Sequence, residues 1–200
     1  MMTGEPRNKI MTYRRYQGFT VSPLIILIAA NLLLYIAVSI SPDLTIRLGL
    51  MPATVSSEPW TLITSMFVHS GLFHILFNML ALFFLGSYLT KLLPNRAFLA
   101  IYFGGGLLGS IFFWLLGPST AIAVGASGAI FAVGGALAVL VPNLRVFVFP
   151  IPAPIPLWAA ILGGFVLLSL LRFVAWEAHL GGLIFGALAG YLFRSRRRYL

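Results

Sequence analysis

The chain contains no cysteine, and charged residues are scarce. Its 200 residues include four acidic side chains, and Asp, Glu, Lys and Arg together make up 8% of the sequence. Without cysteine, no disulfide can staple the fold and no thiol can serve as a nucleophile. A soluble domain is about one quarter charged, so this chain could not cover its surface in water. A soluble enzyme, a disordered protein and a nucleic-acid-binding domain are therefore excluded.

Hydrophobic residues, by contrast, make up 60% of the sequence. They gather in runs close to the length of about 20 residues that a helix needs to cross a bilayer. We therefore predict an all-α membrane protein, a bundle of six transmembrane helices spanning residues 21–193 between basic segments at 1–20 and 194–200. The six runs cover residues 21–40, 72–92, 97–117, 125–141, 155–174 and 176–193.

The distribution of basic residues predicts the orientation of the six spans. With the N-terminus inside, 11 of the 13 Lys and Arg residues lie on the side of both termini, and only Arg47 and Arg172 lie outside. Cytoplasmic loops of membrane proteins carry this excess of positive charge. We therefore predict a multi-pass protein of the cell membrane with both termini in the cytoplasm.

The segment between the first two runs, residues 41–71, is too long for a tight turn and unusually apolar for a free loop. It holds ten large hydrophobic residues, among them Trp60. We predict a membrane-embedded first outer loop, made of short amphipathic pieces in the outer leaflet with Trp60 as an interfacial anchor. A simple outer loop is the alternative.

Four polar residues fall at one depth in this topology. His74 and Asn78 belong to the second span, Ser127 to the start of the fourth and His179 to the start of the sixth. Asn78 follows His74 by four residues, so the two share a helix face. Polar groups inside a membrane are costly and often mark function. The shared level of these four residues indicates a site near the outer surface.

The chemistry of these residues suits a nucleophile and a base. The hydroxyl of Ser127 becomes a nucleophile when an imidazole such as that of His179 accepts its proton. A helix start at Ser127 offers free N–H groups which, with Asn78 and His74, can hold an oxyanion. Glu177 lies two residues before His179 and projects elsewhere on a helix. A Ser–His dyad without a third acidic member is therefore favoured.

Each residue also has a less specific interpretation. The motif Gly125-Ala-Ser-Gly is common in helix packing, and Asn78 can bridge helices by hydrogen bonding. The histidines could bind a metal, but no His-Glu-x-x-His pair is present and His69 and His74 are five residues apart. We expect no metal and no cofactor. A non-enzymatic membrane protein, such as a binder of transmembrane helices or a small transporter, is the rival interpretation.

Three motifs together resemble the rhomboid family of intramembrane serine proteases, in its prokaryotic six-helix form. They are the segment from His69 to Asn78 that contains His74, the Gly-x-Ser-Gly around Ser127, and the Ala-His-Leu-Gly-Gly around His179. The resemblance implies that Ser127 is the nucleophile and His179 the general base. It also implies that Asn78, His74 and the backbone near Gly125 line the oxyanion site, with His69 and Phe131 in supporting positions.

The same resemblance implies a substrate class. A rhomboid-like endopeptidase cleaves single-span membrane proteins near the outer face of the lipid bilayer through an acyl-enzyme. The sequence departs from the family pattern at Phe131, where tyrosine is common, and at Thr61 and Thr90, where arginine and glutamate are common. Phe131 still falls on the face of Ser127, so its ring can stack on His179.

Overall fold

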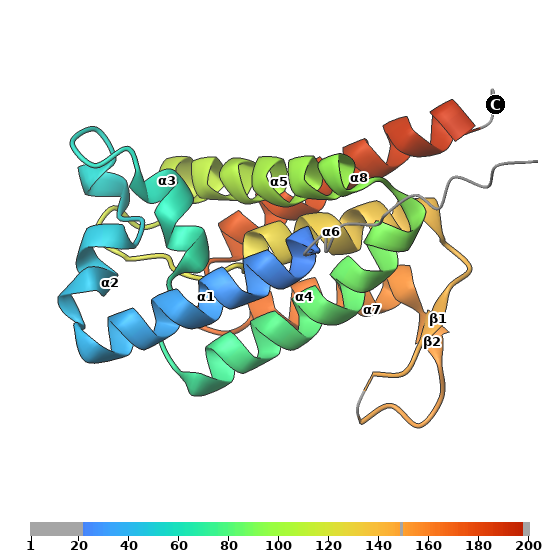
Figure 1. Ribbon diagram of the computed structural model, residues 1–200, viewed down its shortest axis with the longest axis horizontal. Coiled ribbons are helices and arrows are strands. Elements are labelled where there is room, and N and C mark those ends of the chain that lie inside the picture. The colour runs from blue at the N-terminus through green and yellow to red at the C-terminus, as the bar shows by residue number, and fades with distance from the viewer. Residues whose placement is uncertain (1–21, 149, 198–200) are drawn as a thin grey trace, which may run out of the picture.

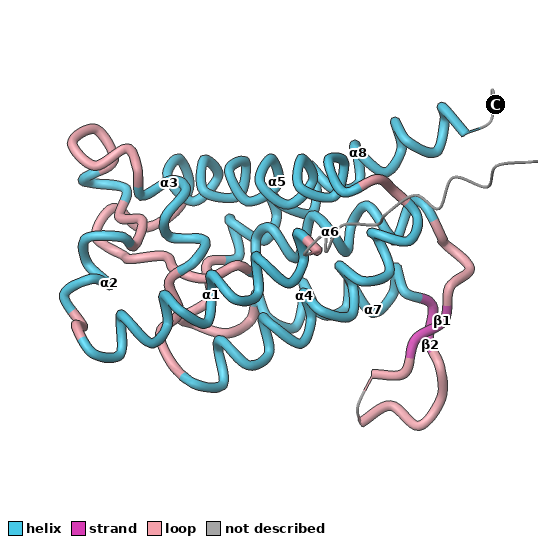
Figure 2. The backbone as a smooth tube through the Cα atoms, in the orientation of Figure 1, coloured by secondary structure: helices cyan, strands magenta, loops and turns pink. Residues whose placement is uncertain are grey.

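The computed structural model describes residues 22–148 and 150–197, which form a bundle of helices (Figures 1 and 2). Each of the six predicted runs overlaps one helix of this bundle. The predicted basic segment at 1–20 lies outside the described residues, as do residues 198–200 of the predicted tail. The six helices are α1 Pro23–Ile40, α4 Leu72–Leu92, α5 Asn95–Leu116, α6 Ser127–Leu140, α7 Leu157–Ser169 and α8 Trp176–Arg197.

Length and apolar composition separate these helices into groups. Helices α1, α4 and α5 are long and apolar enough to cross a membrane, while α6 and α7 are shorter apolar helices. Helix α8 continues to Arg197 and so runs past the predicted end of the sixth span at residue 193. Its last turns carry no glycine or proline after Gly190, and arginine is a good helix former. The predicted boundary at residue 194 is therefore not a break in the helix.

Residues 41–71 fold into short pieces against the start of α6. Helix α2 (Asp43–Leu48) is joined to α3 (Thr61–Thr64) by hydrogen bonds from Trp60 Nε1 to the Arg47 carbonyl at 3.0 Å and from Thr64 Oγ1 to the Leu48 carbonyl at 2.8 Å. Two 3-10 turns, η1 (Pro52–Thr54) and η2 (Ser65–Phe67), complete the segment. Trp60 is half exposed. These contacts give the predicted short pieces a fixed shape, and their depth in a membrane stays a prediction.

A β-hairpin interrupts the helical pattern between α6 and α7. Strand β1 (Arg145–Val146) pairs antiparallel with β2 (Ile155–Pro156), and the hairpin projects from one end of the bundle (Figure 2). The all-α prediction missed it. Two-residue strands are too short to leave an alternating pattern in the sequence, and proline is usual only at a strand edge.

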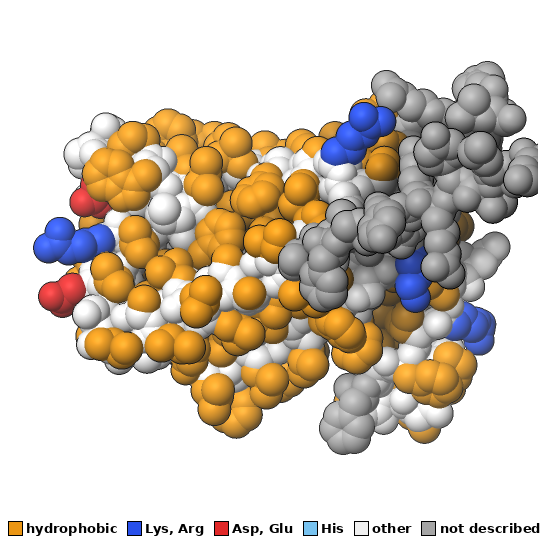
Figure 3. Space-filling view, in the orientation of Figure 1, with side chains coloured by type: hydrophobic (Ala, Val, Ile, Leu, Met, Phe, Trp, Pro, Cys, Tyr) orange, Lys and Arg blue, Asp and Glu red, His pale blue; other side chains and the backbone are white. Residues whose placement is uncertain are grey.

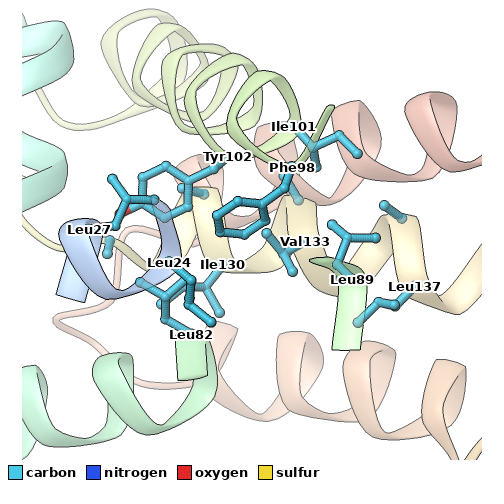
Figure 4. Packing of buried hydrophobic residues seen from close by; sticks show 14 of the residues in the cluster. Leu24, Leu27, Leu82, Leu89, Phe98, Ile101, Tyr102, Ile130, Val133 and Leu137 are labelled. Carbon is cyan, nitrogen blue, oxygen red and sulfur yellow. The ribbon is translucent and has the colours of Figure 1, made fainter. Parts of the chain in front are cut away.

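The core of the bundle lies around α6. Buried side chains of α1, α4 and α5 meet Ile130, Val133 and Leu137 of α6 (Figure 4). On its other side α6 contacts α8 over most of its length. A Cβ atom at Gly182, Gly186 or Gly190 of α8 would collide with the backbone of α6. This row of glycines at four-residue spacing therefore lets the two helices touch backbone to backbone.

On the face seen in Figure 3, the charged side chains of the described residues lie at the two ends of the bundle, and most side chains between them are hydrophobic. We call these ends the α2 end and the hairpin end, after the elements that mark them. The α2 end carries the acidic residues Asp43, Glu58 and Glu177 together with Arg47 and Arg172. The described charged side chains at the hairpin end are all basic, and they are those of Lys91, Arg96, Arg145 and Arg194.

Candidate active site

Two side chains from different helices meet near the α2 end. Ser127 is the first residue of α6, and His179 lies in the first turn of α8. The Oγ atom of Ser127 is 2.7 Å from Nε2 of His179. Hydroxyl and imidazole are thus at hydrogen-bond distance, the arrangement in which a base can take a proton from a nucleophile. The structure brings together the two residues that were predicted to act as a pair.

The aromatic ring of Phe131 packs on His179. Their centroids are 4.6 Å apart and their planes are inclined by 35°. Phe131 lies one helical turn after Ser127 and also contacts Phe165 of α7 edge to face at 6.1 Å. This packing fixes the plane of the imidazole, so that Nε2 faces Ser127.

The other nitrogen of His179 faces no acidic group. Within the described residues, Nδ1 of His179 is buried and has no hydrogen-bond partner. Glu177 is itself buried, yet its carboxylate makes no contact with the ring. The described part of the chain therefore supplies a pair of side chains at this point and no third member.

His74 of α4 lies close to Gly125, two residues before Ser127. Its Nδ1 accepts the backbone N–H of Ser70 at 3.4 Å, which in a neutral imidazole leaves the hydrogen on Nε2. Gly125 lies directly beneath that atom. A Cβ on Gly125 would be 2.7 Å from Nε2 of His74 and 3.7 Å from Ser127 Oγ. An N–H donor of His74 therefore faces the neighbourhood of the serine oxygen.

Gly125 takes part in the site in a way that the sequence did not reveal. Its φ of 122° lies in the left-handed region, which favours glycine. Its N–H donates to the carbonyl of Ser65 at 2.9 Å, and the predicted role of Gly125 at the oxyanion site stays a prediction. Ser65 belongs to η2, and nothing in the sequence pointed to it. The backbone donors left near the serine oxygen are the first N–H groups of α6, which have no partner one turn earlier.

His69 is a buried residue whose ring packs against the ring of His74. It is 1% exposed, and its ring meets that of His74 edge to face at 5.0 Å. Its Nδ1–H donates to the Phe67 carbonyl at 3.3 Å. Burial and, to a smaller extent, the nearby His74 together lower the pKa of His69 to about 4. His69 is therefore neutral at physiological pH and holds the His74 ring in place by packing.

Asn78 lies one turn after His74 in α4. Its Nδ2 donates to the His74 carbonyl at 2.8 Å, and its Oδ1 is buried without a partner among the described residues. An amide nitrogen carries two hydrogens, so one remains for a group in the adjoining cavity. The predicted oxyanion role of Asn78 is compatible with this geometry and stays a prediction.

Two hollows lie at the site, one lined by Ser127 and the other by His74. A cavity of about 280 Å³ between α4, α6 and α7 is lined by Ser127, Asn78 and mostly apolar side chains, including Phe77 and Ile161. A wider hollow of about 810 Å³ opens at the α2 end, where Ser70, His74 and the segments 118–124 and 169–177 line it. An apolar chain can thus approach from the side of the bundle and water from its end.

Comparison with known proteins agrees with these features. Residues 56–196 match the model of the rhomboid domain. RHOMBOID-like protein 1 of Arabidopsis thaliana is 36% identical over 147 residues, which is 71% of this chain and 36% of that protein. Rhomboid protease GluP of Bacillus subtilis is 36% identical over 135 residues, 66% of this chain and 25% of that protein. Inactive RHOMBOID-like protein 8 of Arabidopsis thaliana is 32% identical over 133 residues, which is 66% of this chain and 37% of that protein.

These comparisons identify the family of the chain, whereas its activity does not follow from them. The chain spans about two fifths or less of the length of the three relatives, and they include both a protein named a protease and one named inactive. The matched region contains the helices α3 to α7, all of α8 except its last residue, and both residues of the Ser127–His179 pair. Together with the membrane-length apolar helices, it shows a multi-pass membrane protein. The chain belongs to the rhomboid family.

Proposed function

We propose that this protein is an intramembrane serine endopeptidase that works through a dyad of Ser127 and His179. The 2.7 Å contact between Ser127 Oγ and His179 Nε2 carries the proposal. Nε2 takes the hydroxyl proton while Oγ attacks the carbonyl carbon of the scissile peptide bond. The imidazolium then gives that proton to the leaving amine, and an acyl ester remains on Ser127. Water, activated by the same nitrogen, hydrolyses the ester.

The oxyanion of the tetrahedral intermediate needs donors in place before the reaction. The geometry supports Nε2–H of His74, the first N–H groups of α6 and the second amide hydrogen of Asn78. Gly125 contributes by leaving room for the His74 ring, since any side chain there would fill the space next to Nε2. These donors come from two helices, α4 and α6, which fixes their separation.

The substrates that fit this site are single-span membrane proteins. We propose that a locally unwound segment enters the apolar cavity between α4 and α7 from the lipid, and that water comes through the hollow at the α2 end. In this arrangement the six apolar helices span the cell membrane with both termini in the cytoplasm. The α2 end then faces outward, with residues 41–71 in the outer leaflet. The basic hairpin end agrees with a cytoplasmic location.

A second candidate is a non-enzymatic member of the family that binds transmembrane helices. The similarity to Inactive RHOMBOID-like protein 8 favours it. Both candidates need the lateral cavity, whereas only a protease needs the contact between Ser127 and His179. The decisive experiment must therefore remove that contact without changing the cavity.

The experiment uses purified protein in detergent with a fluorogenic single-span substrate and a fluorophosphonate probe. Wild type should cleave the substrate and react with the probe, and Ser127→Ala and His179→Ala should each abolish cleavage. Losing either member of such a unit costs about as much as losing both. A metal chelator should leave the rate unchanged. Near-normal turnover by Ser127→Ala, or a wild type that binds but never cleaves, would favour the non-enzymatic candidate.

A further inference from the structure

A second apolar groove lies on the surface of the bundle, away from the candidate active site. It has a volume of about 210 Å³ and is lined by Ala100 and Ile101 of α5 and by Phe185, Ala189, Leu192 and Phe193 of α8. Every lining side chain is hydrophobic. The groove faces the region where lipid tails surround a membrane bundle, and its walls offer no polar group to a peptide backbone.

The groove runs toward the hairpin end, where Arg96 lies. Arg96 precedes Ala100 by four residues, so both are on the same face of α5. Side chains of a helix tilt toward its N-terminus, which carries the guanidinium beyond the apolar lining toward the end of the bundle. Four residues of helix rise by about 6 Å. That is a suitable offset between the upper part of an acyl chain and the phosphate to which it is joined.

Arg96 differs from its neighbours in being available. It is exposed and makes no hydrogen bond or ion pair with any described residue. Arg145 instead donates to the Pro154 carbonyl at 3.4 Å, and Arg194 donates to the Val139 carbonyl at 3.1 Å. The described acidic residues, Asp43, Glu58 and Glu177, all lie at the α2 end (Figure 3). Among the described residues, an anion near Arg96 would thus meet cations only, and the ammonium of a zwitterionic lipid would meet no carboxylate.

We propose that the groove between α5 and α8 binds one anionic glycerophospholipid. An acyl chain fills the apolar groove, and the phosphate pairs with the guanidinium of Arg96. Basic pockets between helices on the cytoplasmic side of membrane proteins suit such headgroups. The site shares no lining residue with either hollow of the candidate active site. It therefore stands whether or not the protein is a protease.

The test is native mass spectrometry of the purified full chain in detergent, titrated with dioleoylphosphatidylglycerol and, separately, dioleoylphosphatidylcholine. Wild type should bind the first molecule of phosphatidylglycerol more tightly than the first molecule of phosphatidylcholine. Arg96→Gln should weaken phosphatidylglycerol binding by about fivefold, the effect of one surface cation. Arg96→Lys should keep most of the affinity because it keeps the charge. Ala100→Trp should reduce binding of both lipids by filling the groove.

Two matched variants separate the site from the general charge and apolarity of the surface. Arg145→Gln removes a cation at the same end but not beside the groove, and Ala29→Trp enlarges an exposed alanine of α1. Both should bind as wild type does. Equal affinity of wild type for the two lipids would overturn the proposal. So would equal losses in Arg96→Gln and Arg145→Gln, or unchanged binding in Ala100→Trp.

Discussion

Gly182 of α8 lies against the carbonyl oxygen of Gly128 in α6, and a Cβ at position 182 would overlap that oxygen. Gly182 follows His179 by three residues, and Gly128 follows Ser127 directly. One of the tightest contacts between the two helices is therefore next to the candidate dyad. The 2.7 Å between Ser127 and His179 depends on this contact of two backbones as much as on the two side chains.

Replacing Gly182 by alanine should separate α6 from α8 and lengthen the distance between Ser127 and His179. A displacement of about 1 Å costs on the order of a hundredfold in rate, so we expect at least that loss in kcat. Gly163→Ala is the matched control, because a Cβ at that α7 position meets nothing within 4 Å and Gly163 does not line the cavity that contains Ser127. Its turnover should stay near wild type. Normal turnover by Gly182→Ala would mean that the helix contact does not set the geometry of the pair.

Burial of His69 predicts a loss of stability in acid. The ring has a pKa of about 4 in the folded protein, against an ordinary value of 6.5. Between these pH values the unfolded chain binds the proton and the folded chain does not, so the free energy of unfolding falls as pH falls. The stability is complete above about pH 6.5, and the loss reaches about 3 kcal/mol near pH 4.

Melting temperatures of wild type and His69→Phe, measured from pH 7 to pH 4, check this expectation. Phenylalanine keeps the packing against His74 but cannot take a proton. The melting temperature of wild type should fall more steeply with acid than that of the variant. Parallel curves would show that His69 does not contribute to the acid sensitivity.

The proposed orientation can be tested in intact cells because the chain has no cysteine. Cysteine introduced at Ser119, in the exposed loop before α6, should react with an impermeant thiol reagent from outside. Cysteine at Ser195, in the last turns of α8, should react only after permeabilisation. Labelling of both positions from outside would contradict the six-span topology and remove Ser127 from the outer face.

Hydrophobicity predicted the ends of a helix well where helix-breaking residues closely flank the apolar run. The second run and α4 coincide at Leu72–Leu92, since glycine and proline stand just outside the two ends of that run. The fifth run, 155–174, was less accurate, because α7 ends at Ser169. Hydropathy does not distinguish an apolar helix from the apolar loop that follows it, and residues 170–175 belong to that loop.

The sequence predicted only those parts of the candidate active site that depend on residue type and on the position of a residue along its span. Ser127 and His179 were placed together because both begin a span on the same side. The left-handed backbone of Gly125 and its hydrogen bond to Ser65 were not predictable. Both depend on how residues 41–71 fold back onto the start of α6, and short irregular pieces leave no periodic signal.

The last prediction concerns Asn78, for which the chain supplies its own control. Asn78 and Asn31 are both buried, and each donates from Nδ2 to the carbonyl four residues earlier, at 2.8 Å and 2.7 Å. Only Asn78 adjoins the cavity that contains Ser127. If Asn78 donates its second hydrogen to the oxyanion, Asn78→Ala should lower kcat by roughly 10²–10³ and leave KM and the melting temperature nearly unchanged. Asn31→Ala should affect the melting temperature alone. Loss of stability without loss of kcat in Asn78→Ala would make this residue a structural bond within α4, and the oxyanion would then depend on His74 and the first N–H groups of α6.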